Sequence, residues 1–170
     1  MPRRLIDRCR PESIREFRAS ARQRYHDGLA LAGAGNRTAA IYLWGYAGEM
    51  TLKAAYFSLF GLAEEDLITV PGHIQPAINR GRAAPLSIAW PNQGAGHNVR
   101  AWAELLVGVR ALAAATAYGP AFAVQVQGCG QSVWQLWRET LRYHKNRAYL
   151  YEVRHVREAT EWLLVNSDHL

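Results

Sequence analysis

Cysteine and lysine are scarce in this sequence, and it contains no long apolar run. The two cysteines, Cys9 and Cys129, stand alone, so they make neither a disulfide framework nor a pair with metal-ligand spacing. No segment offers the roughly 20 uninterrupted apolar residues of a membrane helix. The start, MPRRLIDRCRPES, lacks the apolar run of a secretory signal. These absences predict a cytoplasmic protein that has no membrane segment, no metal site and no other cofactor.

Positive charge comes almost entirely from arginine, which supplies 18 of the 20 cationic residues and gives a net charge of +6. The planar guanidinium group binds phosphate in a bidentate way that lysine cannot match. The charge is uneven, because residues 1–24 hold eight arginines and three acids, whereas residues 34–82 hold four cations and four acids. This pattern favours RNA or a nucleotide as partner. A genome whose codons favour arginine would give the same composition.

The length of 170 residues and the apolar fraction of 49% fit a single domain over residues 1–170, which buries roughly 70% of its unfolded surface. Apolar residues recur at helical spacing and predict helices over about 12–33, 38–60, 98–118 and 146–165. Residues 120–137 are ambiguous, because the strand-like run FAVQVQ leaves a hairpin open. The predicted fold is all-α, an up-and-down bundle of four to five helices with its core over about 12–165.

Residues 70–96 contain four prolines and four glycines. Both residue types interrupt regular structure, so we expect one long connection here with at most a short helix. Long connections inside compact domains are often functional or mobile. The sequence does not show whether this connection closes over anything.

Two charged residues interrupt the segment 38–60, which is apolar nearly all round and therefore predicts a central helix. Glu49 and Lys53 are four residues apart, in the order that favours an ion pair within a helix. An unpaired buried charge is very costly, so we expect the two to form a buried polar pair. A second interpretation has them lining a polar pocket for a nucleotide.

Three segments together resemble the HEPN superfamily. They are AAIYLWGYAGEMTLKAAYFSLFGL (39–62), GHNVRAWAELL (96–106) and LWRETLRYHKNRAYLYEVRHVREATEWLL (136–164). The resemblance implies an up-and-down helical bundle that is commonly a homodimer. Its active members are metal-independent ribonucleases with an Arg-x4–6-His motif near the last long helix. Other members are nucleotide-binding or partner-binding modules beside a nucleotidyltransferase, and both kinds occur in toxin–antitoxin and antiphage systems.

Arg138 and His144 match that motif as Arg-x5-His. By resemblance His144 would be the general base and Arg138 the phosphate clamp, a division of roles that suits metal-free RNA cleavage. Two observations oppose this assignment. The carboxylate of Glu139, next to Arg138, would repel a phosphate substrate. Side chains six positions apart on one helix point about 120° away from each other. Further candidates for holding nucleic acid are Arg142, Tyr143, Lys145 and Arg147.

Two functions therefore stay open for this chain. The first is an RNA-binding or nucleotide-binding protein with metal-independent RNA cleavage as its candidate activity. The second is a non-catalytic module that docks a partner protein such as a nucleotidyltransferase. The other histidines carry structural expectations. His97 caps or packs at a helix start, His73 lies in a turn, and His155 belongs to an aromatic face as a packed core or interface histidine.

Overall fold

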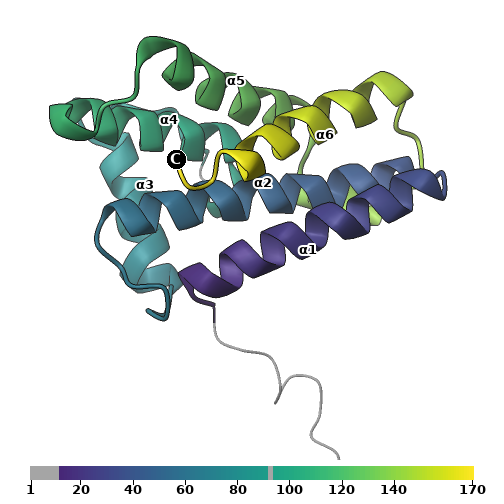
Figure 1. Ribbon diagram of the computed structural model, residues 1–170, viewed down its shortest axis with the longest axis horizontal. Helices are drawn as coiled ribbons and strands as arrows, with labels where there is room; N and C mark the ends of the chain where they lie inside the picture. The colour runs from purple at the N-terminus through teal and green to yellow at the C-terminus, as the bar shows by residue number, and fades with distance from the viewer. Residues whose placement is uncertain (1–11, 92–93) are drawn as a thin grey trace, which may run out of the picture.

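The computed structural model describes residues 12–91 and 94–170, and in these ranges the chain is an all-α bundle without a β-sheet (Figure 1). The prediction of an all-α fold is thereby confirmed. Cys9 and four of the N-terminal arginines lie outside the described residues. The helices are α1 (Ile14–Gly33), α2 (Arg37–Leu59), α3 (Gln75–Arg82), α4 (Val99–Leu112), α5 (Pro120–Leu136) and α6 (Leu150–Val165).

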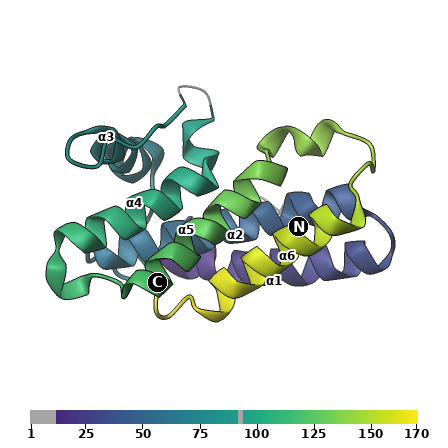
Figure 2. The ribbon, with the colours of Figure 1, turned by 90° about the horizontal axis from the view of Figure 1, so that it is seen from above.

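Helix α2 is the central element, as its nearly uniform apolar surface predicts. It packs against α1 on one side and against α6 and α4 on the other. Figure 2 shows α5 lying between α4 and α6. The core is closed by large side chains that are fully buried, among them Trp44 of α2, Trp102 of α4 and Trp137, which follows α5. No helix in the described ranges is long and apolar enough to cross a membrane.

The helix boundaries follow from local capping. The Ser13 side chain accepts a hydrogen bond from the Glu16 amide, and the Asn98 side chain accepts one from the Ala101 amide at 3.0 Å, so each satisfies an amide in the first turn of its helix. After α2 the chain turns at Gly61, whose φ of +81° is a conformation that glycine adopts without steric cost.

Residues 120–136 form helix α5, so the hairpin left open by the sequence is wrong. The buried residues Val126, Cys129, Gly130 and Val133 recur at helical spacing. Gly130 allows the close approach to α4, because a Cβ at this position would lie 2.5 Å from the Cβ of Ala103. The β-branched residues that suggested a strand lie partly on the exposed face, where Val124 is 68% exposed.

The segment 70–96 is not one continuous loop. A π-helical turn over Val70–Ile74 leads directly into α3, and Ile74, Ala77 and Ile78 are buried against the core. Past α3 the chain reaches a 3₁₀ turn over Ala95–His97, next to the start of α4. The short helix that the sequence allowed in this segment thus anchors it, and the segment brings His97 against α2.

Candidate functional site

The last helix begins later than the sequence predicts, at Leu150 instead of near Asn146. The preceding residues run along the start of α2. The Asn146 side chain accepts a hydrogen bond from the Thr38 amide at 3.0 Å, and Thr38 Oγ1 accepts bonds from the amides of Arg147 and Ala148 at 2.8 and 3.0 Å. These bonds satisfy polar groups at the start of α2 and hold the predicted site segment against that end of the bundle.

Two hollows lie along this segment, and His144 lines both of them. One has a volume of about 350 Å³ and also contains Tyr42 and Arg142. The other has a volume of about 290 Å³ and also contains Lys145 and Arg147. We call the exposed side chains Arg142, His144, Lys145 and Arg147 around these hollows the basic end. Four of the predicted residues are therefore brought together.

Arg138 does not line either hollow. Its Nη1 donates hydrogen bonds to the carbonyl oxygens of Trp134 and Trp137, the latter at 2.5 Å, and its guanidinium group lies 3.5 Å from the centre of the Trp134 ring. Burial lowers the pKa of this side chain. Arg138 therefore satisfies carbonyl groups at the C-terminal end of α5 and lines neither of the hollows that His144 lines.

Arg142, unlike Arg138, lines one of the hollows together with His144. Its side chain is exposed, and its guanidinium group lies 4.7 Å from the centre of the Tyr143 ring. The neighbouring Tyr143 and Tyr42 side chains raise the pKa of Arg142, so the guanidinium group is charged at neutral pH. Tyr143 is itself 74% exposed. An aromatic ring and a guanidinium group are therefore presented together to solvent.

A second polar cluster lies in the middle of α2. Lys53 Nζ donates to Glu49 Oε1 at 2.5 Å, and the two residues are only 7% and 3% exposed. His97 Nδ1 lies 3.0 Å from Glu49 Oε2 and 3.2 Å from Oε1. An ionised carboxylate can only accept, so Nδ1–H is the donor. The buried carboxylate is thus shared between a lysine and a histidine.

The contacts within this cluster favour the charged forms of Glu49 and His97. Burial alone would raise the pKa of Glu49, but Lys53 and His97 outweigh it, and the pKa of Glu49 is lowered. The hydrogen bond to Glu49 raises the pKa of His97 against the opposing effect of burial, and the carboxylate of Glu139 adds to the rise. His97 is the functional candidate that the sequence underrated. The sequence signal was Glu49, because a carboxylate buried in an apolar helix needs more than one partner.

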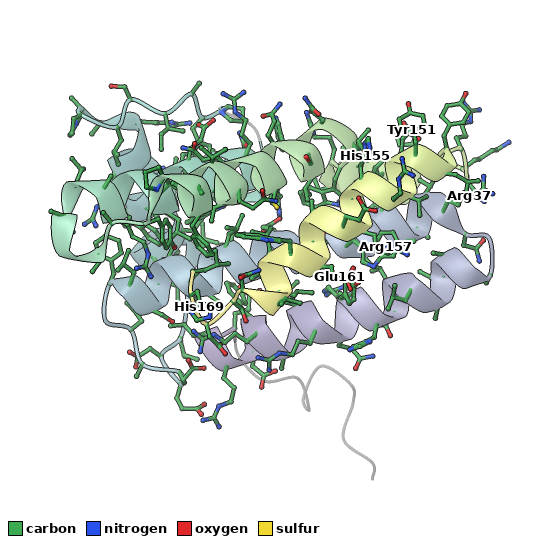
Figure 3. The ribbon with its side chains drawn as sticks, turned by 45° about the horizontal axis from the view of Figure 1, so that its top comes forward. Arg37, Tyr151, His155, Arg157, Glu161 and His169 are labelled. Atoms are coloured by element: carbon green, nitrogen blue, oxygen red, sulfur yellow. The ribbon has the colours of Figure 1, made fainter. Side chains whose placement is uncertain are left out.

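His73 and His155 have simpler surroundings. His73 lies in the π-helical turn, as expected, where its Nδ1 accepts a hydrogen bond from the Thr69 amide at 3.0 Å. His155 is exposed on α6 beside Tyr151 (Figure 3), so it is not a core histidine, and the other expectation, an interface histidine, stays a prediction. Tyr149 is 66% exposed, because the bonds to Thr38 carry the chain past the start of α2 before α6 begins.

The chemistry available at these sites is acid–base and electrostatic. In the ranges that the structure describes, no group of three or more histidine, cysteine, aspartate or glutamate side chains could hold a metal ion. Burial raises the pKa of the Cys129 thiol to about 11, so this thiol is not a nucleophile near neutral pH. The sequence matches no protein-family model and no curated protein, and no solved structure matches the fold.

Proposed function

We propose that this chain is a HEPN-like helical domain that binds single-stranded RNA or a nucleotide through its basic end. The observation that carries the proposal is the gathering of Arg142, His144, Lys145 and Arg147 around two hollows at the start of α2. The resemblance of three segments to the HEPN superfamily supports the same assignment. A toxin–antitoxin or antiphage role would follow from that resemblance.

The basic end has the chemistry that a phosphate backbone requires. Among the described residues, no carboxylate forms an ion pair with Arg142, Lys145 or Arg147, so these cations remain available for phosphate oxygens. Tyr143 and Tyr149 are largely exposed at the same end and offer ring faces on which bases can stack. Arg37, at the start of α2, lies at this end too (Figure 3).

Within this proposal Arg142, and not Arg138, is the phosphate ligand beside His144. Arg138 would have to leave two carbonyl oxygens and the Trp134 ring before it could reach a substrate. His144 as the base of a metal-independent cleavage remains a prediction. Its side chain is exposed, and no side-chain hydrogen bond within the described residues fixes its orientation.

The binding experiment uses a fluorescently labelled single-stranded RNA and measures anisotropy. The double variant Arg142→Gln/Arg147→Gln removes two positive charges from the basic end, and we expect a large loss of affinity. Arg15→Gln is the control, because Arg15 is exposed and pairs with Glu65 at 2.5 Å near the opposite end of α1. Equal affinity of wild type and the double variant would exclude the basic end as the RNA site.

A second candidate function, docking of a protein partner or of a second copy, is favoured by one observation. Tyr149, Leu150 and Tyr151 are all more than half exposed around the start of α6, and the two tyrosine rings stack with centres 6.0 Å apart. Exposed aromatic side chains are enriched at protein interfaces. Light scattering coupled to size-exclusion chromatography tests the homodimer, which the variant Leu150→Ser/Tyr151→Ser should dissociate.

A further inference from the structure

The polar cluster of Glu49, Lys53 and His97 has a geometry that structural packing alone does not require. Nδ1 of His97 faces the buried carboxylate of Glu49, so Nε2 is the ring nitrogen left for another molecule. The histidine side chain is 40% exposed, whereas that of Glu49 is 4% exposed. A buried carboxylate that orients a partly exposed imidazole is the arrangement that fixes the tautomer of a general base.

We propose that His97 is a general base for RNA cleavage and that Glu49 is its positioning residue. The inference rests on the proposed RNA binding and adds a reaction to it. His97 differs from His144 in the feature that matters most for proton transfer, because its ring is held in place. The hydrogen bond to Glu49 holds one edge, and the ring of Tyr46 packs against it with centres 5.9 Å apart.

Glu49 is in turn held from its other side. Lys53 bonds to it at 2.5 Å, and the ammonium group of Lys53 lies 5.5 Å from the centre of the Trp102 ring. The carboxylate therefore cannot rotate away from His97 without leaving a buried charge unpaired. A role for Glu49 in holding His97 accounts for the presence of a glutamate and a lysine in the buried part of α2.

A continuous row of side chains links His97 to the basic end. Arg142 and Tyr42 line the same hollow, the ring centres of Tyr42 and Tyr46 lie 5.0 Å apart, and those of Tyr46 and His97 lie 5.9 Å apart. Tyr42 and Tyr46 are both half-buried in α2. A single strand with one phosphate on Arg142 would reach His97 along this row, and its bases would lie against tyrosine rings.

The proposed step balances without a metal or a co-reactant. Nε2 of His97 takes the proton of a ribose 2′-hydroxyl, and the 2′-oxygen forms a bond to the adjacent phosphorus. The bond from that phosphorus to the 5′-oxygen breaks, and the leaving oxygen takes a proton from water. The products are a 2′,3′-cyclic phosphate and a 5′-hydroxyl. His97 then returns its proton to solvent.

The charged and titratable groups around His97 set the pH dependence. Glu49 and Glu139 raise its pKa, while burial and Lys53 lower it, and the net shift is upward. A base acts only when deprotonated, so cleavage should increase as pH rises through this elevated pKa. Removing the Glu49 charge should move the ascending limb of the pH–rate profile to lower pH. A purely structural role for Glu49 would leave the limb where it is.

The test measures binding and cleavage separately, on labelled single-stranded RNAs in EDTA. His97→Gln should lower the cleavage rate about 100-fold or more, the usual contribution of a general base, while affinity for RNA is retained. His155→Gln is the control, because His155 is an exposed histidine of α6 that lines neither hollow, and it should cleave at close to the wild-type rate. Glu49→Gln/Lys53→Met removes both charges of the buried pair and leaves no unpaired buried charge, so the protein can fold. This double variant therefore shows whether the ascending limb of the pH–rate profile depends on Glu49.

The outcomes separate the two proposals. Wild-type protein that binds RNA but does not cleave it, or His97→Gln that cleaves like wild type, would overturn the role of His97 and leave the binding proposal standing. If the ascending limb of the pH–rate profile of Glu49→Gln/Lys53→Met lies at the same pH as in wild type, the positioning role of Glu49 is overturned. Wild-type protein that binds none of the RNAs would overturn the proposed function and this inference with it.

Discussion

Nδ1 of His97 lies 3.0 Å from Oε2 of Glu49, although 48 positions separate the two residues in the chain. The pKa of His97 is raised in the folded state, chiefly by this hydrogen bond. A raised folded-state pKa stabilises the fold below the unfolded value of about 6.5. That contribution is lost as pH rises through the folded pKa.

The first prediction concerns the pH dependence of stability. Urea unfolding of wild type and His97→Gln should differ most near pH 6 and progressively less towards pH 9, because the charged imidazole is the form that Glu49 stabilises. Nuclear magnetic resonance titration should give a His97 pKa above the usual value of about 6.5. A difference between the two proteins that grows with pH would contradict this account.

The second prediction concerns the buried ion pair. Lys53→Met removes the main partner of a carboxylate that is 3% exposed, so the free energy of unfolding should fall by roughly 3–5 kcal/mol at alkaline pH. The loss should be smaller at acid pH, where protonated His97 still pairs with Glu49. Glu49→Gln/Lys53→Met should recover much of the loss. Urea denaturation that shows Lys53→Met as stable as wild type would contradict the pairing.

The third prediction concerns the hydrogen bonds that attach the basic end to α2. Thr38→Val removes the oxygen that accepts bonds from the Arg147 and Ala148 amides, so it should cost about 1–3 kcal/mol and weaken RNA binding. Thr51→Val is the control, since its hydroxyl donates to the Ala47 carbonyl within α2 at 2.8 Å and does not contact the basic end. Thermal unfolding and RNA anisotropy measure the two effects. Equal RNA affinity of Thr38→Val and wild type would contradict the link.

The fourth prediction compares two glycines of α2. A Cβ at Gly45 would lie 2.1 Å from the ring of Trp137, whereas a Cβ at Gly48 meets nothing closer than 3.6 Å. Gly45→Ala should therefore destabilise the fold by about 1–3 kcal/mol through overpacking. Gly48→Ala should be neutral or stabilising, because alanine favours a helix interior over glycine. Similar melting temperatures for the two variants would contradict the packing of Trp137 on α2.

The sequence predicted the helices whose apolar periodicity and end signals agree. Helix α2 is the clearest case, with an apolar surface and Gly61 directly after its end. Helix α5 was ambiguous because its β-branched residues and Gly128 favour other structures locally, and its stability comes from packing against α4 and α6. The start of α6 was placed too early because the bonds that delay it run to Thr38, on a distant helix.

The candidate site was predictable in composition but not in arrangement. The cations between residues 142 and 147 do gather around two hollows, because the segment follows the start of α2. Arg138 and His144 were paired on spacing alone, and spacing does not reveal that the backbone carbonyls of Trp134 and Trp137 engage Arg138. The contact of His97 with Glu49 is a tertiary one, and periodicity carries no information about it.

The salt dependence of RNA binding tests the central claim most directly. Each phosphate contact contributes about 0.7 to the slope of log affinity against log salt for single strands. Arg142→Gln/Arg147→Gln should therefore reduce that slope by about 1.4 and weaken binding to every RNA tested. Arg15→Gln, remote from the hollows, should leave the slope as in wild type. An equal slope in wild type and the double variant would show that the basic end does not hold phosphate.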